Sequence, residues 1–139
     1  MEIKIYKAFP PEAKAVREEV FINEQGFSYD YDEVDDIALH FVMFEDGLPV
    51  AACRIFQRET TDTFGFGRLA VKKECRKKKY GSMMLDAIKD YVRSAGGNAI
   101  VLHSQLQAKE FYAKNGFQEY GEIEYEENCP HIWMKFKIK

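Results

Sequence analysis

A basic loop that leads through a glycine into a strong helix is the stretch of this chain best suited to binding a ligand. Residues 72–79 carry six basic side chains against one acidic, and Gly81 follows them. The N-terminus of a helix presents unpaired N–H groups and a partial positive charge, both of which favour a bound phosphate. Gly81 would allow close approach of the backbone, and Arg76 could grip a phosphate bidentately. The stretch therefore predicts a phosphate-binding junction between a strand and a helix.

The same basic run is compatible with two other interpretations, a solvated helix cap and a patch for nucleic acid. The net charge of the chain is −3, however, and no nucleic-acid motif accompanies the run, so we expect no nucleic-acid partner. A Walker phosphate loop is absent from the sequence. The Gly-Phe-Gly at 65–67 lies inside a predicted strand, so it is no dinucleotide fingerprint.

Composition limits the class of protein further. The 139 residues, 46% hydrophobic and 31% charged, predict one globular domain over 1–139. No apolar run approaches the roughly 18 residues of a membrane span, and no secretory signal precedes the first strand, so we expect a cytoplasmic protein without membrane contact. The odd cysteines at 53, 75 and 129 predict reduced thiols rather than disulfides or a zinc site.

The elements that must position the junction follow from hydrophobic periodicity. Residues around Ile3 and Ile5 predict a strand, and Pro10-Pro11 opens a helix that should end near Gly26. The remaining predicted elements are a hairpin of strands 38–44 and 50–56, a strand 64–71, a helix 80–95, a strand 98–103, a short helix 105–114 and strands near 117–121 and 131–137. The order β-α-β-β-β-α-β-α-β-β predicts an α/β (α+β) fold with a mixed, twisted sheet and helices on both faces.

At the junction the sequence resembles the GNAT superfamily of acyl-CoA-dependent N-acyltransferases. The resemblance spans residues 3–136, and the front half and the tail are similar to a bacterial branch of small members. Three segments carry it: Arg68-Leu69-Ala70-Val71, the pyrophosphate-loop pattern from Arg76 to Ser82, and Gln105 to Tyr112 followed by Asn115-Gly116-Phe117. In two places the sequence departs from the pattern: Lys79 stands where the loop has its first glycine, and Gln105 where the family often has asparagine.

The resemblance implies the binding mode of an acyl-CoA. The cofactor arm would pair with the backbone of Leu69, Ala70 and Val71 in a splay of the sheet, and the fold would be the GNAT fold. The residues implied in gripping the pyrophosphate are Arg76, Lys77, Lys78, Lys79, Tyr80, Gly81 and Ser82, with Gln105, Ala108 and Phe111 adding further cofactor contacts. Lys79 cannot take positive φ cheaply, so either that position is helical or the loop is shifted and its binding weakened.

The resemblance also implies the chemistry, which is direct attack of a primary amine, from a small molecule or a protein, on the thioester of acetyl-CoA. A backbone N–H at Leu69 or Ala70 would hold the oxyanion, and Tyr112 would be the general acid that protonates the thiolate, since a phenol is protonated at neutral pH. The base stays open among Glu24, Glu33, Asp35, His40, His103, His131 and a water, with His131 and His103 carried as candidates. The spacing of the histidines predicts no metal.

The acidic run at 30–36 carries five acids that could draw in a cationic amine. Two alternative functions remain. One is a catalytically weak acyl-CoA-binding module, which Lys79 favours. The other is an acyltransferase similar to acyl-homoserine-lactone synthases, resting on Arg17, Phe21, Glu24, Asp35 and Asp36. Because dimers are common in the resembled family, a homodimer is a further open expectation.

Overall fold

The computed structural model describes residues 1–58 and 62–138. Its strands and helices follow the predicted order. They are β1 (Glu2–Tyr6), α1 (Pro11–Arg17), a π-helical segment (Glu18–Glu24), a 3₁₀ turn (Glu33–Asp36), β2 (Leu39–Glu45), β3 (Leu48–Gln57), β4 (Thr63–Val71), a 3₁₀ turn (Lys73–Cys75), α2 (Tyr80–Ser94), β5 (Ala99–Gln105), a 3₁₀ turn (Leu106–Ala108), α3 (Lys109–Lys114), β6 (Gln118–Glu126) and β7 (Cys129–Lys137).

The strands form one mixed sheet, as predicted, in the order β1-β2-β3-β4-β5-β7-β6. The β4–β5 pair is parallel, whereas β1–β2, β2–β3, β5–β7 and β6–β7 are antiparallel. The chain divides into two compact units: an N-terminal unit, Met1–Phe56 with Gly67–Ala87, and a C-terminal unit, Gln57–Phe66 with Ile88–Lys139. In the described part of the chain, no helix combines the length and apolarity needed to cross a membrane.

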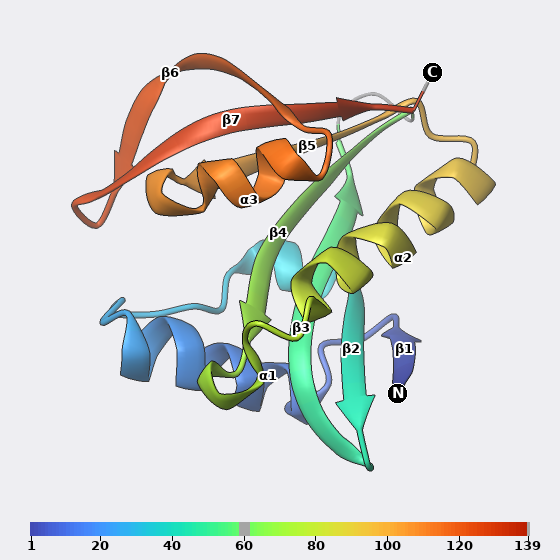
Figure 1. The fold of residues 1–139 in the computed structure, drawn as a ribbon, viewed down its shortest axis with the longest axis vertical. Coiled ribbons are helices and arrows are strands. Elements are labelled where there is room, and N and C mark those ends of the chain that lie inside the picture. The colour runs from blue at the N-terminus through green and yellow to red at the C-terminus, as the bar shows by residue number, and fades with distance from the viewer. Residues whose placement is uncertain (59–61, 139) are drawn as a thin grey trace. The chain divides into compact units, whose positions relative to one another are not determined.

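The N-terminal unit is built on the β2–β3 hairpin, with β1 beside β2 (Figure 1). Asp46 and Gly47 turn the hairpin with φ of 53° and 80°, as a tight turn between twisted strands requires. Ala13, Val16, Val20 and Phe21 of the first helical region form one core cluster with Val42, Ala52 and Ala70 of the strands β2, β3 and β4. Gly26, at φ 81°, ends the helical region where the sequence predicted. The π-helical second half was not predicted, because the pattern of apolar residues does not distinguish it from an α-helix.

The C-terminal unit centres on β5, whose residues Ile100, Val101 and Leu102 are buried. The strand β6 lies at the edge of the sheet and is exposed along its whole length. It runs to Glu126, five residues beyond its predicted end. The prediction ended too early because the strand contains many glutamates, which have low strand propensity. After α3, Gly116 has a φ of 93°, and a Cβ there would lie 2.8 Å from the Phe136 ring. Glycine is thus required by both conformation and space at this turn.

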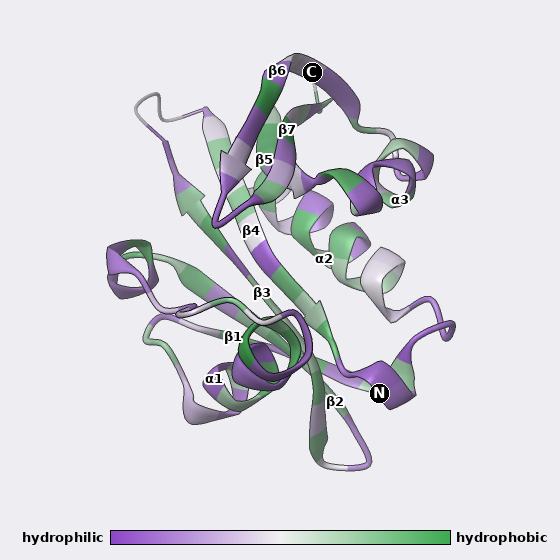
Figure 2. Cartoon of the chain, turned by 90° about the vertical axis from the view of Figure 1, so that its left-hand side faces the viewer, coloured by the Kyte–Doolittle hydropathy of each residue, from purple (hydrophilic) through white to green (hydrophobic). Residues whose placement is uncertain are grey.

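Helix α2 is amphipathic, as predicted. Its buried face includes Met84, Leu85, Ile88 and Val92, which are all fully buried. Figure 2 shows hydrophobic and hydrophilic residues alternating around this helix. Since the apolar face fixes the rotation of the helix, it also fixes the direction in which the first turn and the preceding basic loop face.

Candidate functional site

The loop before α2 has an alternating backbone conformation that suits anion binding. Lys77 and Lys79 have φ of 70° and 64°, and Lys78 between them keeps a negative φ. Such alternation points successive N–H groups into one concavity, and the N–H groups of the first helical turn add to it. Of the two alternatives for Lys79, a helical conformation or a shifted loop, the helical one is excluded by the φ of 64°. Lys79 takes the left-handed conformation that glycine would adopt, at a cost of about 1–2 kcal/mol for a residue with a Cβ.

Arg76 already has an anionic partner within the N-terminal unit. Its guanidinium donates to both carboxylate oxygens of Glu24, at 2.5 and 2.6 Å, and its Nε donates to the carbonyl of Val71 at 3.0 Å. The hydrogen bond from Arg76 holds the pKa of Glu24 below its ordinary value. This is the fork geometry with which Arg76 was predicted to grip phosphate. A phosphate bound that way would have to displace Glu24.

Tyr80 and Lys78 are bound to Glu45, at the end of β2. The Tyr80 hydroxyl donates to the Glu45 carboxylate, and Lys78 Nζ lies 3.6 Å from it. The hydrogen bond to Glu45 raises the pKa of Tyr80 to about 12. The buried Tyr80 side chain therefore anchors the start of α2, and only its backbone is available to the predicted cofactor.

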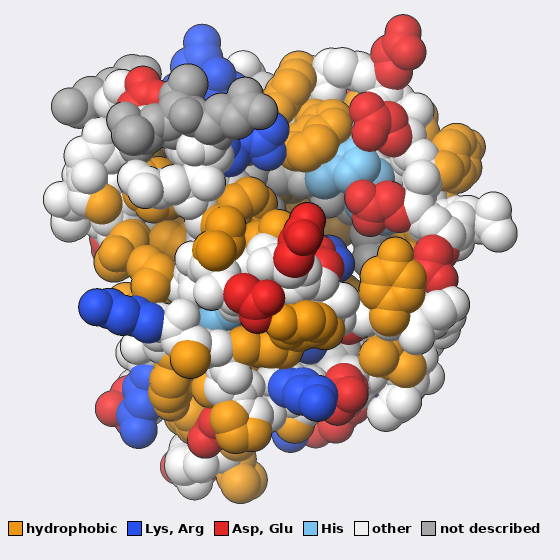
Figure 3. Space-filling model, turned by 180° about the vertical axis from the view of Figure 1, so that it is seen from behind, with side chains coloured by type: hydrophobic (Ala, Val, Ile, Leu, Met, Phe, Trp, Pro, Cys, Tyr) orange, Lys and Arg blue, Asp and Glu red, His pale blue; other side chains and the backbone are white. Residues whose placement is uncertain are grey.

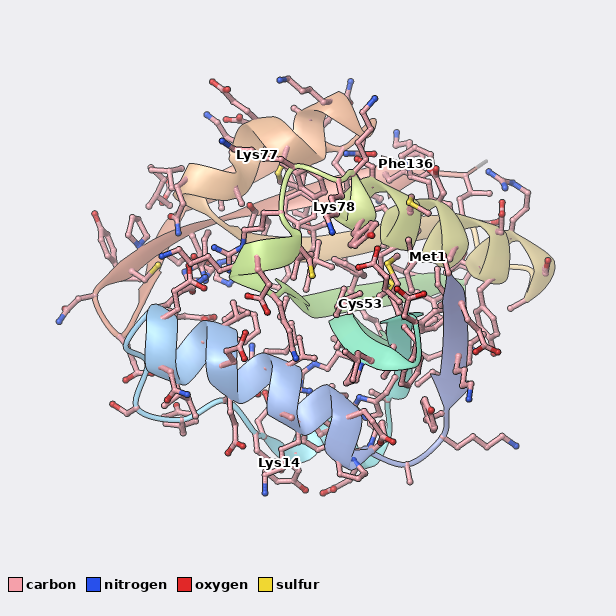
Figure 4. All side chains as sticks on the ribbon, turned by 60° about the horizontal axis from the view of Figure 1, so that its bottom comes forward. Met1, Lys14, Cys53, Lys77, Lys78 and Phe136 are labelled. Atoms are coloured by element: carbon pink, nitrogen blue, oxygen red, sulfur yellow. The ribbon has the colours of Figure 1, made fainter. Side chains whose placement is uncertain are left out.

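Between Arg76 and α2, Lys77 and Lys79 are the basic side chains left for a ligand. Both are exposed, and neither has a hydrogen bond or ion pair to any residue that the structure describes. Figure 4 shows Lys77 and Lys78 on the loop that leads into α2. Gly81 and Ser82 are half-buried in the first turn of the helix. The loop thus combines two free cations with a concave main chain.

The strand before the loop has an irregular backbone at its predicted oxyanion site. Arg68 takes a φ of 54° in the middle of β4. A left-handed residue interrupts regular strand pairing and redirects the neighbouring N–H and C=O groups. Leu69 and Val71 are half-buried and Ala70 is buried. The backbone just after Arg68 is therefore where a redirected N–H is expected.

The acidic run folds onto three arginines of the same unit. Arg17 binds Asp30 at 2.6 Å and grips Asp35 with two bonds of 2.7 and 2.9 Å. Arg54 binds Asp35 at 2.9 Å. The other bonds within this Asp–Arg cluster join Asp32 to Arg54 at 2.6 and 3.1 Å and to Arg68 at 3.2 Å, and Asp30 to Arg68 at 3.1 Å. Three of the five acids of the run are thus neutralised internally.

Two predicted base candidates belong to this cluster. Burial opposes ionisation of Asp35, but the bonds from Arg17 and Arg54 outweigh it and lower its pKa to about 2. Burial lowers the pKa of His40, whose Nε2 donates to the Asp35 carbonyl at 3.0 Å. A carboxylate this weakly basic and a histidine buried in the core are poor proton acceptors. We therefore assign Asp35 and His40 structural roles rather than that of the general base. Of the other candidates, Glu24 is bound to Arg76, and Glu33 is exposed.

In the C-terminal unit, the structure brings the other two histidine candidates together. His103 on β5 and His131 on β7 have ring centroids 4.9 Å apart. His103 also stacks on Trp133, its cross-strand neighbour, with ring centroids 4.4 Å apart. Two glutamates of β6 complete this His–Glu cluster, with Glu126 3.1 Å and Glu124 3.6 Å from the ring of His103.

The glutamates of the His–Glu cluster were not predicted. Residues two apart on a strand face the same side, so the Glu-x-Glu pattern at 124 and 126 indicates two carboxylates on one face of a strand. The sequence did not predict that β6 extends as far as Glu126, so this pattern could not be interpreted before the structure was known. In the described part of the chain, no set of three or more His, Cys, Asp or Glu side chains is arranged to hold a metal ion.

Tyr112 is buried in an aromatic cluster of the C-terminal unit. Its ring contacts Phe111, Phe117 and Phe66 at centroid distances of 5.1, 5.9 and 6.3 Å. Phe111 and Ala108 are half-buried on the same helical segment. The side-chain oxygen of Gln105 accepts a hydrogen bond from Gln107. These residues of the predicted cofactor contact set therefore share one structural unit with both candidate histidines.

Comparisons with known proteins agree with the fold. A family model for the acetyltransferase (GNAT) domain matches residues 7–138. A Bacillus subtilis protein, itself assigned only provisionally as an acetyltransferase, is 32% identical over 124 residues, covering 86% of this chain and 83% of its own. A Lactobacillus plantarum protein of known structure superposes with a TM-score of 0.87 at 25% identity, covering 100% of both chains. An aminoglycoside 6′-N-acetyltransferase solved with coenzyme A superposes with a TM-score of 0.77 at 16% identity, covering 100% of this chain and 98% of its own.

Proposed function

We propose that this chain, which belongs to the GNAT acetyltransferase family, transfers an acetyl group from acetyl-CoA to a primary amine. The acceptor is a small molecule or a protein side chain, and the reaction takes place in the cytoplasm. The acetyl donor is bound as coenzyme A thioester by the backbone of Leu69, Ala70 and Val71 and by the loop from Arg76 to Ser82.

The observation that carries this proposal is the backbone of the loop before α2. Two lysines there hold the left-handed conformation despite its cost, which an alternative loop with ordinary φ would avoid. Strained residues of this kind persist where a function requires the geometry. A diphosphate accepts hydrogen bonds from a concave run of N–H groups without regard to side chains, so Lys79 can replace glycine.

The reaction needs a base, an oxyanion donor and an acid. We assign the oxyanion to the N–H of Leu69 or Ala70, next to the left-handed Arg68, and thiolate protonation to Tyr112 by its place in the family motif. His103 and His131 remain the base candidates, because in each ring Nδ1 is hydrogen-bonded to an oxygen and Nε2 is left to accept a proton. The amine attacks the thioester carbon directly, so no covalent enzyme intermediate forms.

A binding measurement followed by a turnover measurement tests the proposal. Acetyl-CoA should raise the melting temperature of the protein, since a ligand specific for the folded state stabilises it. A thiol-release assay across a panel of amines then detects transfer. Binding without release for every amine would leave a CoA-binding module, and absence of binding would overturn the proposal.

Substitutions in the loop separate a main-chain grip from simple attraction of charge. Lys79→Gly should keep acetyl-CoA affinity within about threefold and raise stability by about 1 kcal/mol, because it relieves the left-handed strain. Lys79→Glu should weaken affinity by about tenfold, which is about 1.4 kcal/mol. Lys14→Glu, on the exposed face of α1 (Figure 4), changes net charge equally and should leave affinity unchanged.

A further inference from the structure

The His–Glu cluster fixes which nitrogen of His103 carries a proton. The Nδ1 of His103 lies 3.1 Å from Oε1 of Glu126, within hydrogen-bond distance. A carboxylate oxygen accepts, so Nδ1 is the protonated nitrogen of the neutral ring. The lone pair then lies on Nε2, which is buried and has no hydrogen-bond partner among the described residues. A carboxylate on Nδ1 and a bare Nε2 is the arrangement of a general base.

The ring of His103 also packs against two other rings. Trp133 stacks on it with ring centroids 4.4 Å apart, and the ring of His131 lies 4.9 Å away. Arg58 in turn covers Trp133, 5.3 Å from the indole centre. Because the ring cannot turn freely, Nε2 keeps one direction, as a base in an active site must.

His131 differs from His103 in the partner of its Nδ1. That nitrogen donates to the neutral Cys129 carbonyl at 2.9 Å, so the lone pair again lies on Nε2. A carboxylate on Nδ1 stabilises a protonated imidazole more than a neutral carbonyl does, and Glu126 is already hydrogen-bonded to His103. The Nε2 of His131 lies 3.7 Å from Oε2 of the same Glu126, so His131 shares this carboxylate and the base role falls to His103.

Glu124 lies beside Nε2 of His103, the ring nitrogen that Glu126 does not bind. Its Oε1 lies 3.6 Å from Nε2, beyond a hydrogen bond, and its side chain is exposed. Because β6 places Glu124 and Glu126 on one face, the two carboxylates flank the two nitrogens of one ring. Figure 3 shows histidine side chains at the surface with acidic side chains beside them. A cation that bonds to Glu124 would therefore lie beside the bare Nε2.

We propose that Glu126 is a positioning residue that holds Nε2 of His103 ready as the general base, and that Glu124 receives the acceptor as an ammonium ion at that nitrogen. This inference rests on the proposed acetyl transfer and adds the residues that receive the amine and take its proton. His131 is assigned to supporting the His103 ring.

The proton balance follows from this arrangement. The ammonium gives one proton to Nε2 of His103, and its freed lone pair forms the C–N bond at the thioester carbon. The C–S bond breaks, and its electron pair leaves with the sulfur. The thiolate takes a proton from Tyr112, which regains one from the nitrogen of the new amide. His103 releases the remaining proton to solvent, so one proton is produced for each acetyl group transferred.

Kinetics with spermidine, cadaverine and lysine as acceptors test the roles. His103→Asn should lower kcat by about 100-fold, the range expected for a general base. Glu126→Ala should lower kcat by about tenfold or more, and Glu126→Asp should recover most of the loss, with KM for acetyl-CoA unchanged in both. Glu124→Gln should instead raise KM for the amine about fivefold and leave kcat within about twofold. Glu122→Ala, an exposed glutamate of the same strand, is the matched control and should change neither constant.

Nitrogen NMR of the imidazoles in the whole protein tests the geometry without turnover. The unmodified protein should show His103 protonated at Nδ1, and Glu126→Ala should shift the proton toward Nε2 while Glu122→Ala does not. An unchanged tautomer or an unchanged kcat in Glu126→Ala overturns the positioning role, even if acetyl transfer is intact. If the unmodified protein transfers no acetyl group to any of these amines, the proposed function fails, whatever the tautomer.

Discussion

The two carboxylate clusters of this chain use the same charge in opposite ways. In the Asp–Arg cluster, Asp30 and Asp35 are almost fully buried, and arginines occupy their oxygens. In the His–Glu cluster, Glu124 and Glu126 are more than half exposed and face imidazole nitrogens. In the Asp–Arg cluster, the arginines keep the carboxylates ionised. In the His–Glu cluster, the imidazoles can accept and release a proton.

The difference shows that the density of acids in a sequence does not indicate where chemistry occurs. The run at 30–36 is the most acidic segment. Three of its carboxylates are nevertheless paired with Arg17, Arg54 and Arg68, so their charge is not available to a cationic substrate. Glu124 and Glu126 of β6 lie among apolar and aromatic residues, and no arginine that the structure describes pairs with either of them. Burial and partner type, rather than charge count, separate the structural cluster from the candidate catalytic one.

The largest effect should follow from breaking the Asp–Arg cluster. Asp35→Asn leaves Arg17 buried without a full counter-charge and removes one partner of Arg54. Loss of one member of a buried ion pair typically costs about 3–5 kcal/mol. Urea unfolding followed by circular dichroism should show a loss of this size.

Glu33→Gln is the matched control for Asp35→Asn, because Glu33 lies in the same run but is exposed. Its free energy of unfolding should change by less than about 0.5 kcal/mol. Equal losses in the two variants would contradict the view that the acidic run is a buried structural cluster.

The next prediction concerns acid. Since the pKa of Asp35 is lowered from 3.8 to about 2, the carboxylate stabilises the fold fully at pH values above its ordinary pKa. That contribution is lost as pH falls from about 4 towards about 2, because the unfolded chain then binds the proton more tightly. Urea midpoints measured across this window should fall in the unmodified protein. Asp35→Asn, which has no carboxylate at that position to titrate, should show a shallower fall.

Periodicity alone was enough to predict the order of strands and helices, because apolar residues at intervals of 2 and 3.6 report which face is buried. The helix over 80–94 and the strand over 99–105 are the clearest cases. The site was less accessible. Arg17, Arg54 and Arg68 come from three separate elements, so only the fold shows that they converge on one acidic run.

The conformation of the basic loop was beyond sequence reasoning for a different reason. A lysine at 79 indicates an ordinary φ, and the left-handed value is imposed by the surrounding chain. The partner of Arg76 was missed likewise, since Glu24 lies 52 residues earlier. Local propensity describes what a residue prefers, and tertiary contacts decide what it adopts.

The Arg76–Glu24 pair is intermediate between the two clusters and gives a smaller effect. It is an arginine–carboxylate fork, as in the Asp–Arg cluster, but both side chains are about one-third exposed. Glu24→Gln should remove the competing anion and tighten acetyl-CoA binding by about three- to tenfold, or about 0.7–1.4 kcal/mol. Titration calorimetry would measure this change, with the exposed Glu18→Gln as control. Weaker binding in Glu24→Gln would mean that Glu24 orients Arg76 for the cofactor rather than competing with it.

The smallest effect on stability should come from the cluster with the largest expected effect on turnover. Glu126→Ala removes an exposed carboxylate whose bond to His103 is open to water, so the free energy of unfolding should change by less than about 1 kcal/mol. Urea unfolding of Glu126→Ala beside Glu122→Ala measures the difference. A loss as large as that of Asp35→Asn would make Glu126 a structural residue, and its effect on kcat would then report damage to the fold. A small loss together with an altered His103 tautomer would show that the Asp–Arg cluster stabilises the fold, whereas Glu126 of the His–Glu cluster acts on the chemistry through His103.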